Sequence, residues 1–552
     1  MVGEAFNENL ETISKLLESG EVSSIGVYGM GGVGKTTLAK HIHNRLLQHS
    51  QGRVIWVTVS QEFSVTILQD KIARFIGLDF VGEDDEELRA ERLHTTFSRM
   101  KNSVLILDDV WENFDLSKVG CPISVECCRL IITTHSLEVC RQVFCQEVIQ
   151  VEILHDDEAW ELFNETLRNE IELDSSVEEI ARSVAELCGG VPLGIVTMAA
   201  SMRGETTIHT WRDAYVELRE LVSGNDGMGD GDVYTVLKYS FDRLNRNHHI
   251  QSNEFNTLQQ CFLHCALYPD DEEIMREHLV KEFISGGLMD GRKTRRAQGE
   301  QGHSVLDKLV NVCLLERCVV PGMFGPTECV KMHDLVRSMA LKICKGKYMV
   351  RAGCNLKKFP KEAEWAKDLE KVSFMNNGIM RIEEGISPDC PKLTTFLLRD
   401  NVCLEFIPDS LFSKMQGLRT LDLCSTSITK LPNSICAMKS LEALLLEWCE
   451  RLENVPYLGE MKELRELNLS HTAIEEVPEG TEELVNLKFL GMDAPELEML
   501  PRGLFLKLGN LQHLELPSHI KVVVEEIANL KQLEEFSGRM TTVNGFTSVI
   551  RR

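Results

Sequence analysis

The sequence predicts a multidomain protein with a parallel α/β domain first, a mostly helical region next and a repeat solenoid at the C-terminal end. Three observations predict this class. Short β-branched runs alternate with helical stretches over the first 150 residues, a glycine-rich loop joins the first such run to a helix, and a leucine pattern recurs through the last third. A length of 552 residues leaves room for three or four domains.

Composition and charge exclude several functions. The chain carries 59 Lys and Arg against 85 Asp and Glu, a formal charge of −26, which repels phosphate backbones and argues against a direct nucleic-acid partner. Its 18 cysteines are scattered without a C-x-x-C pair, so neither a zinc motif nor a redox motif is predicted. No signal peptide or long apolar run appears, which predicts no transmembrane segment and a reducing, cytoplasmic location.

The first domain begins with a short apolar strand followed by a helix. Strands are predicted at Val22–Tyr28, Val54–Val59, Val104–Leu107 and Leu130–Thr133, and the first helix at Leu38–Leu47. Strands that alternate with helical stretches are typical of a parallel sheet covered by helices.

A glycine-rich run lies directly after the first predicted strand and opens the first helix. It consists of Gly29, Met30, Gly31, Gly32, Val33, Gly34, Lys35, Thr36 and Thr37, which satisfies the pattern G-x-x-x-x-G-K-[ST]. The glycines let backbone N–H groups curl around an anion, and the helix N-terminus adds the positive end of its dipole. Lys35 can reach the β- and γ-phosphates, and Thr36 can place its hydroxyl on Mg²⁺. The run predicts a site for ADP or ATP with Mg²⁺ rather than a merely flexible glycine turn.

A second motif follows 73 residues after Lys35, where the apolar strand Val104–Leu107 ends in Asp108 and Asp109. The carboxyl end of a parallel strand lies at the edge of the sheet where a phosphate loop also lies. We therefore expect Asp108 to hold Mg²⁺ and Asp109 to orient or deprotonate an attacking water.

The pattern L-x-x-L-x-L recurs from about Leu369. Clear copies begin at Leu418, Leu441, Leu464 and Leu511, looser ones begin at Leu369, Leu393 and Leu487, and the starts are 23 to 25 residues apart. Prolines recur in the return segments, where a strand-breaking residue belongs. The spacing predicts a leucine-rich repeat solenoid of about seven units over residues 369–537, because a helical bundle could not keep this phase across regular prolines.

Residues 152–345 between these parts are mostly helical in pattern, with loops predicted at 223–231 and 321–327. An acidic run, Glu83–Glu87, is interpreted as a solvated loop in the α/β part.

Five short sequence motifs occur in an order that resembles the order in a known protein family. They are Gly29–Thr37, Val104–Trp111, Gly190–Gly194, Cys261–Asp270 and Met332–Asp334. Followed by a solenoid, they resemble the plant nucleotide-binding leucine-rich-repeat immune receptors of the coiled-coil class. The resemblance implies a P-loop α/β domain over 1–150, a helical domain over 151–225, a winged-helix domain over 226–345 and the repeats over 346–552.

The resemblance also implies roles for single residues. Val2 and Gly3 would lie near the adenine, and Pro192 would pack on the base from the helical domain. His333 would touch the β-phosphate of bound ADP, whereas the alternative reading makes it an ordinary polar residue at a helix start.

Two features depart from the family. The family has Thr-Thr-Arg where this chain has Thr133-Thr134-His135, and a shorter, mostly neutral histidine is a poorer γ-phosphate partner than a guanidinium. The chain also begins at Met1, just upstream of the nucleotide domain, so the family's coiled coil is expected to be missing.

The expected function is an ADP/ATP switch of plant innate immunity, closed with ADP and activated by exchange to ATP when a pathogen effector is perceived. As an enzyme it would be at most a slow ATPase, because fast hydrolysis would keep a switch off. Two alternatives remain open: a continuously cycling P-loop ATPase and a nucleotide-independent repeat scaffold.

The solenoid is expected to bind a pathogen effector or a guarded host protein, and the resemblance implies a homo-oligomer in the active state and association with the plasma membrane or nucleus. Residues that alternate with the leucines should form its binding face: Ala443, Leu445, Glu447, Glu466, Asn468, Phe489 and Asp493. The alternative is that the chain's own nucleotide-binding module shields Leu445 and Phe489.

Two smaller clusters are predicted to be structural. Cys261, His264 and Cys265 have helical spacing but no fourth ligand nearby, so core packing is favoured over metal binding. The basic run Arg292–Arg296 is favoured as a solvated loop over a nuclear import signal.

Overall fold

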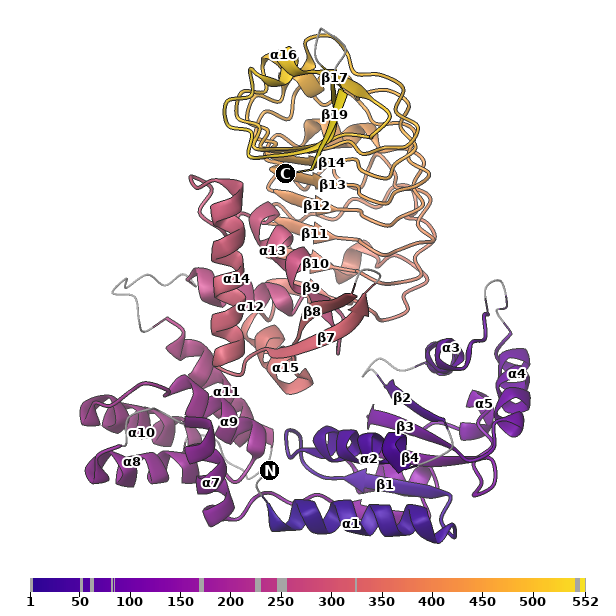
Figure 1. Ribbon diagram of the computed structural model, residues 1–552, viewed down its shortest axis with the longest axis vertical. Helices are drawn as coiled ribbons and strands as arrows, with labels where there is room; N and C mark the ends of the chain where they lie inside the picture. The colour runs from indigo at the N-terminus through magenta and orange to yellow at the C-terminus, as the bar shows by residue number, and fades with distance from the viewer. Residues whose placement is uncertain are drawn as a thin grey trace. The chain divides into compact units, whose positions relative to one another are not determined.

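The computed structural model describes residues 3–49, 53–59, 64–80, 83, 85–167, 173–223, 230–245, 256–322, 325–541 and 547–551 (Figure 1). The chain divides into two compact units. The first comprises Met1–Ser252, Leu309–Glu316 and His333–Met339, and the second comprises Asn253–Lys308, Arg317–Met332 and Ala340–Arg552.

A five-stranded parallel sheet forms the centre of the α/β part of the first unit. Its order is β2-β3-β4-β1-β5, so the chain crosses over between strands that are not neighbours. The strands are β1 (Ser24–Tyr28), β2 (Val54–Thr58), β3 (Ser103–Val110), β4 (Cys128–Thr134) and β5 (Glu147–Gln150). The predicted parallel α/β domain is confirmed.

Helices cover both faces of this sheet, because alternate residues of each strand enter two separate cores. On β3, Val104 and Ile106 pack with helices α1 and α2, whereas Leu105 and Leu107 pack with α3 and α4. The helices are α1 (Glu4–Ser19), α2 (Lys35–His49), α3 (Val65–Ile76), α4 (Glu86–Arg99), α5 (Leu116–Val119) and α6 (Leu137–Gln142). Glu86 and Glu87 form the first turn of α4 rather than a loop, because Asp85 caps that helix by accepting from two of its backbone N–H groups.

The rest of the first unit is helical. Its core contains Phe163, Trp211 and Tyr239, each almost fully buried. The helices are α7 (Asp156–Leu167), α8 (Ser175–Glu186), α9 (Pro192–Ser201), α10 (Ile208–Ser223) and α11 (Asp230–Arg243).

Residues 257–343 form helices and a small sheet of order β6-β8-β7, and they belong to the second unit apart from residues 309–316 and 333–339, which belong to the first. These elements are α12 (Thr257–Cys265), β6 (Ile274–Met275), α13 (Arg276–Ser285), α14 (Arg295–Asn311), β7 (Glu316–Gly322), β8 (Gly325–Lys331) and α15 (Asp334–Ile343). The loop predicted at 321–327 is therefore wrong outside residues 323–324, which are not described. Val330 and Cys329 in β8 are buried and pair with β6, and backbone pairing of that kind outweighs a local loop signal.

The solenoid is an 11-stranded sheet whose strands are parallel except for the last (Figure 1). Its strands are β9 (Tyr348–Val350), β10 (Lys371–Ser373), β11 (Thr395–Leu397), β12 (Thr420–Asp422), β13 (Ala443–Leu445), β14 (Glu466–Asn468), β15 (Phe489–Gly491), β16 (His513–Glu515), β17 (Lys521–Val523), β18 (Glu535–Thr541) and β19 (Thr547–Arg551). The leucine-rich repeat prediction is confirmed.

One continuous apolar core runs through the solenoid from Phe359 to Phe536. Repeat leucines such as Leu421, Leu444 and Leu467 are fully buried in it. The sheet nevertheless begins earlier than residue 369, because β9 pairs in register with β10 without carrying the leucine pattern.

Candidate functional site

The glycine-rich loop lies between β1 and α2, at the carboxyl end of the parallel strands. Gly32 and Gly34 have φ values of 72° and 101°, in the left-handed region that favours glycine. A Cβ on Gly32 would lie only 2.8 Å from the Cβ of Leu193, so this position requires glycine for space as well. The turn directs the first backbone N–H groups of α2 toward the loop.

Lys35 points into its own loop. Its Nζ donates to the carbonyl oxygens of Gly29 and Met30, both at 2.9 Å, and the residue is 6% exposed. The loop therefore holds one buried cation beside backbone N–H groups, which is the combination that binds a phosphate anion.

Asp108 lies at the end of β3, where it faces the first turn of α2. One of its carboxylate oxygens, Oδ1, accepts from the hydroxyl of Thr36 at 3.1 Å and from the hydroxyl of Thr133 at 2.5 Å. Hydroxyl and carboxylate oxygens are the ligands that Mg²⁺ prefers, so this pair suits the ion.

Asp109 leaves the strand ladder. The register of β3 against β4 shifts between Leu107 and Val110, and Asp109 has a φ of 61°. Its N–H donates to Thr133 Oγ1 at 2.8 Å, and its Oδ2 accepts from Trp111 Nε1 at 2.7 Å. A bulge of this kind re-aims a side chain beside a site, here the carboxylate of Asp109.

His135 lies between two carboxylates. Its ring stacks on Trp111 with the centroids 4.5 Å apart, and its Nε2 is 3.2 Å from Asp109 Oδ1 and 3.9 Å from Asp334 Oδ2. These three polar groups come from β3, from the residue after β4 and from the start of α15. Among the residues that the structure describes, they form the one cluster of three such groups close enough to share a metal ion.

The segment around Asp334 lies against the loop. His333 Nδ1 contacts the carboxylate of Asp334 and lies 3.3 Å from the backbone nitrogen of Leu335, while a Cβ on Gly31 would lie 2.9 Å from Leu335 Cδ1. Burial alone would raise the pKa of Asp334, but the positive charge and hydrogen bond of His333, the Leu335 N–H and His135 together lower it. Asp334 is therefore held as a carboxylate next to His135.

The helical part of the first unit also reaches the loop. Pro192 starts α9, and the N–H of Leu193 donates to Gly32 O at 3.2 Å. Of the two residues expected near the adenine, Val2 lies outside the described residues and Gly3 directly precedes α1.

The structure thus brings the loop, Asp108, Asp109, His135, Pro192 and His333 into one compact unit. Sequence reasoning missed three neighbours, Trp111, Leu193 and Leu335. Each lies inside or directly after a motif that the sequence does show. Their position next to these motifs was the only sequence signal that they belong to the site.

The expected binding face of the solenoid is covered. Leu445 and Phe489 are only 8% and 5% exposed, and Ala443, Glu466 and Asn468 are buried too. Arg295 of α14 lies over the Phe489 ring at 4.6 Å and pairs with Glu466, which also accepts from Ser285 of α13. The prediction of a free patch at these residues is wrong. The alternative, shielding by the chain's own nucleotide-binding module, fits Phe489, because Arg295 of the winged-helix part covers its ring.

The structure fits the prediction for the cysteine cluster but differs from the prediction for the basic run. Cys261, His264 and Cys265 are buried in α12, with His264 Nε2 3.1 Å from Glu282, which fits core packing. Arg292 is solvated, but Arg295 is not, because its pairing with Glu466 draws it against the solenoid.

Comparison with known families matches three parts of the chain. Residues 6–171 match the NB-ARC domain, residues 267–340 match the disease resistance protein winged-helix domain, and residues 369–450 match the leucine-rich repeat. A P-loop NTPase domain followed by a winged helix and leucine-rich repeats defines a nucleotide-binding leucine-rich-repeat protein. The chain belongs to the plant disease resistance proteins of this class.

Two Arabidopsis thaliana relatives illustrate the match. Disease resistance protein RPS5 is 34% identical over 522 residues, covering 91% of this chain and 56% of the relative. Disease resistance protein At4g27190 is 31% identical over 549 residues, covering 95% of this chain and 54% of the relative. The chain spans about half the length of the curated relatives it matches.

Among solved structures, similarity extends to a signal transduction ATPase with a tetratricopeptide repeat sensor from Pyrococcus horikoshii. The two share 16% identity at a TM-score of 0.37, over 62% of this chain and 42% of that one. Within the described part of this chain, no helix is both long and apolar enough to cross a membrane.

Proposed function

We propose that the protein is an ADP/ATP-binding switch of plant immunity, closed with ADP and activated by exchange to ATP when a pathogen effector is perceived. One observation carries the proposal: Asp334 and Leu335 lie against His135 and Gly31 of the phosphate-loop region. A switch needs contacts that differ between its two nucleotide states, and a segment resting on the phosphate loop can supply them.

In this proposal Gly29–Thr37 cradles the phosphates, with Lys35 turning from its own carbonyl oxygens toward them. Thr36 and Asp108 hold Mg²⁺, which neutralises phosphate charge when bound. His333 touches the β-phosphate of ADP, and Pro192 packs on the base.

In this proposal Asp109 orients the attacking water, and hydrolysis is at most slow. Its two oxygens are already engaged by Trp111 and His135. Because both carboxylate oxygens already have partners, they are less available to an attacking water, so slow resetting is favoured over a continuously cycling ATPase. The buried Lys35 argues against a nucleotide-independent scaffold, since an ammonium inside a glycine loop serves an anion.

The identity of the nucleotide that co-purifies with the full chain tests the proposal. We expect about one ADP per chain by chromatography of the denatured protein, and phosphate release far slower than one turnover per second. Absence of nucleotide would favour the scaffold, and rapid steady-state phosphate release would favour the cycling ATPase.

The repeats fit a protein partner, in this proposal a pathogen effector or a guarded host protein, and the active form is a homo-oligomer. Because α13 and α14 occupy the face around Glu466 and Phe489, a partner must use other repeat surfaces or displace these helices. The proposed location is the cytoplasm.

A further inference from the structure

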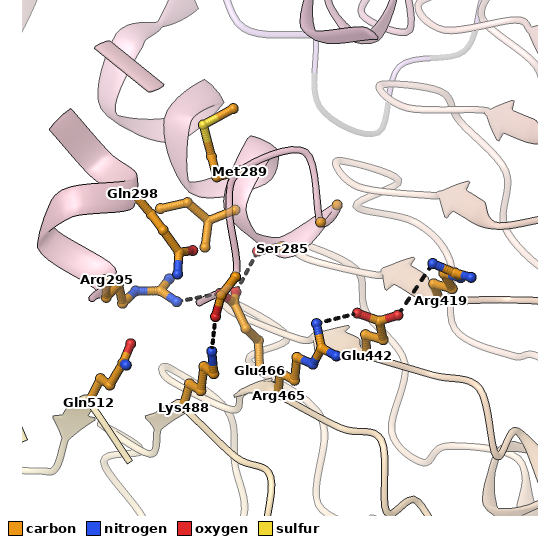
Figure 2. Close-up of a pocket in the computed structure, with 14 residues that line it drawn as sticks. Ser285, Met289, Arg295, Gln298, Arg419, Glu442, Arg465, Glu466, Lys488 and Gln512 are labelled. Atoms are coloured by element: carbon orange, nitrogen blue, oxygen red, sulfur yellow. Dashed lines mark hydrogen bonds and ion pairs between the residues drawn. The ribbon is translucent and has the colours of Figure 1, made fainter. Parts of the chain in front are cut away.

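A cavity of about 240 Å³ lies between the winged-helix elements and the concave side of the solenoid, inside the second unit (Figure 2). One wall is the end of α13, the loop after it and the first turn of α14. The other wall is a row of side chains, one from each of five successive repeats: Arg419, Glu442, Arg465, Lys488 and Gln512.

That row occupies a single position of the repeat, the residue directly before strands β12 to β16. Each backbone N–H in the row donates to the carbonyl of the residue one repeat earlier, as Arg465 does to Glu442 at 2.8 Å. Regular pairing of this kind stacks the five side chains at strand spacing, so neighbours in the row interact directly.

The cavity is positively charged in a strongly acidic chain. Its lining contains four cations, Arg295, Arg419, Arg465 and Lys488, against the two carboxylates of Glu442 and Glu466. This leaves a formal charge of +2, although the whole chain carries −26.

Both carboxylates are already paired. Glu442 bridges Arg419 at 3.6 Å and Arg465 at 3.0 Å, and Glu466 takes Arg295 and the hydroxyl of Ser285 (Figure 2). The surplus positive charge therefore lies at the other end of the row, where Arg465 and Lys488 are neighbours.

Two features at that end are unfavourable without a ligand. Lys488 is a partly buried cation beside Arg465. Its ammonium donates to the carbonyl oxygen of Gly291, but burial and the neighbouring charge of Arg465 still lower its pKa. Gln512 is only 7% exposed, and its Oε1 is buried with no hydrogen-bond partner among the described residues. An anion that also carries a hydroxyl group satisfies both, because it accepts from the cations and donates to the amide oxygen.

We propose that this cavity binds a small phosphorylated metabolite, with Arg465 and Lys488 holding the phosphate and Gln512 holding a neighbouring hydroxyl. Its volume is below that of a typical pocket for a drug-sized ligand, so the occupant is compact. Because Arg295 and Gln298 of α14 share the cavity with the solenoid row, a bound ligand joins α14 to the repeats.

Titration of the full chain with pyrophosphate tests this site, in a Lys35→Met background that removes the phosphate-loop contribution. We expect one binding event per chain by calorimetry and a rise in the unfolding temperature. The double substitution Arg465→Gln with Lys488→Met should weaken binding about tenfold or more, because two charge-assisted contacts are lost.

The matched control is Arg502→Gln with Lys507→Met, which removes the same charge from exposed residues outside the cavity lining and should leave the affinity unchanged.

If the first double variant does not fold, Gln512→Glu supplies a second test, since an added carboxylate should repel the probe. Equal affinity in both double variants, or no binding at all, overturns the proposal. Binding of succinate in preference to pyrophosphate also overturns it, in favour of an acidic protein side chain. Nucleotide retention at the phosphate loop is measured separately, so failure here leaves the proposed switch intact.

Discussion

Lys35 places its ammonium between two carbonyl oxygens of its own loop, where a phosphate oxygen would compete for it. The ammonium is a compact point charge on a flexible stem, so it can turn from the carbonyls to a ligand. A planar guanidinium cannot fit the same buried space with the same freedom.

We therefore expect Lys35→Arg to abolish tight nucleotide retention, lowering the bound nucleotide about tenfold or more. The measurement is nucleotide content per chain after gel filtration. Lys40→Arg on the exposed side of the same helix is the control and should retain nucleotide normally. Equal retention in the Lys35→Arg variant and the original protein would contradict the role of the loop.

His135 is held by stacking on Trp111 and by the carboxylates of Asp109 and Asp334. We expect His135→Arg to strengthen ATP binding relative to ADP, because a charge-assisted contact to the γ-phosphate contributes about 1.5–3 kcal/mol. The ratio of ATP to ADP affinity should rise roughly tenfold or more by equilibrium titration. His135→Gln, which adds no charge, serves as the control; an unchanged ratio in the arginine variant would mean that position 135 does not face the γ-phosphate.

At the scale of elements, α13 is tied to the solenoid by a buried ionic cluster within the second unit. Glu282 of α13 accepts from Tyr268 at 2.6 Å and lies 3.1 Å from His264 and 3.9 Å from Arg399, which also pairs with Asp422 at 2.9 Å. Removing one partner of such a cluster leaves a buried charge uncompensated.

Glu282→Gln should therefore destabilise the second unit by about 3 kcal/mol. Hydrogen exchange in the full chain should show faster exchange in α13 and in the β11 and β12 repeats. Glu277→Gln on the same helix removes a carboxylate that is 82% exposed and should change little. Protection that is identical in both variants would show that Glu282 does not hold α13 on the repeats.

Acid should loosen the same contact. Burial alone would raise the pKa of Glu282, but the His264 hydrogen bond and the charges of Arg399 and His278 lower it to about 2. The pKa of this carboxyl is lower in the folded protein than in the unfolded chain. Its contribution to stability is therefore complete at a pH above the unfolded-state pKa, and it is lost as the pH falls toward the folded-state pKa. Urea unfolding at a series of pH values should show stability lost between about pH 4.5 and 2. The Glu282→Gln variant should lack that part of the loss; an equal acid response in both proteins would assign it to other carboxyls.

At the scale of the whole molecule, the segment around Asp334 is far in sequence from the phosphate loop and yet lies in the same compact unit. The chain between them contributes the helical part and most of the winged helix. In the proposed switch, a contact of this kind would let nucleotide identity act on elements distant along the chain.

We expect Asp334→Val to make the protein constitutively open, with ADP dissociating about tenfold faster, because the variant removes the carboxylate that orients His333 and His135. Release of a fluorescent ADP analogue measures this rate. Asp334→Asn keeps the shape and hydrogen-bonding capacity and should have an intermediate effect. An ADP dissociation rate equal to that of the original protein would show that the contacts of Asp334 do not hold the closed state.

By itself the sequence determined the parallel α/β domain, the phosphate loop and the repeat solenoid. These depend on local periodicity and short motifs, such as the run that ends in Lys35 and the leucine spacing around Leu444. Only the tertiary structure decided that Trp111 stacks on His135, that Leu193 and Leu335 pack on the glycine loop, and that α14 covers Phe489. Sequence patterns could not supply these contacts, because they join residues from separate elements whose meeting depends on the packing of the whole unit.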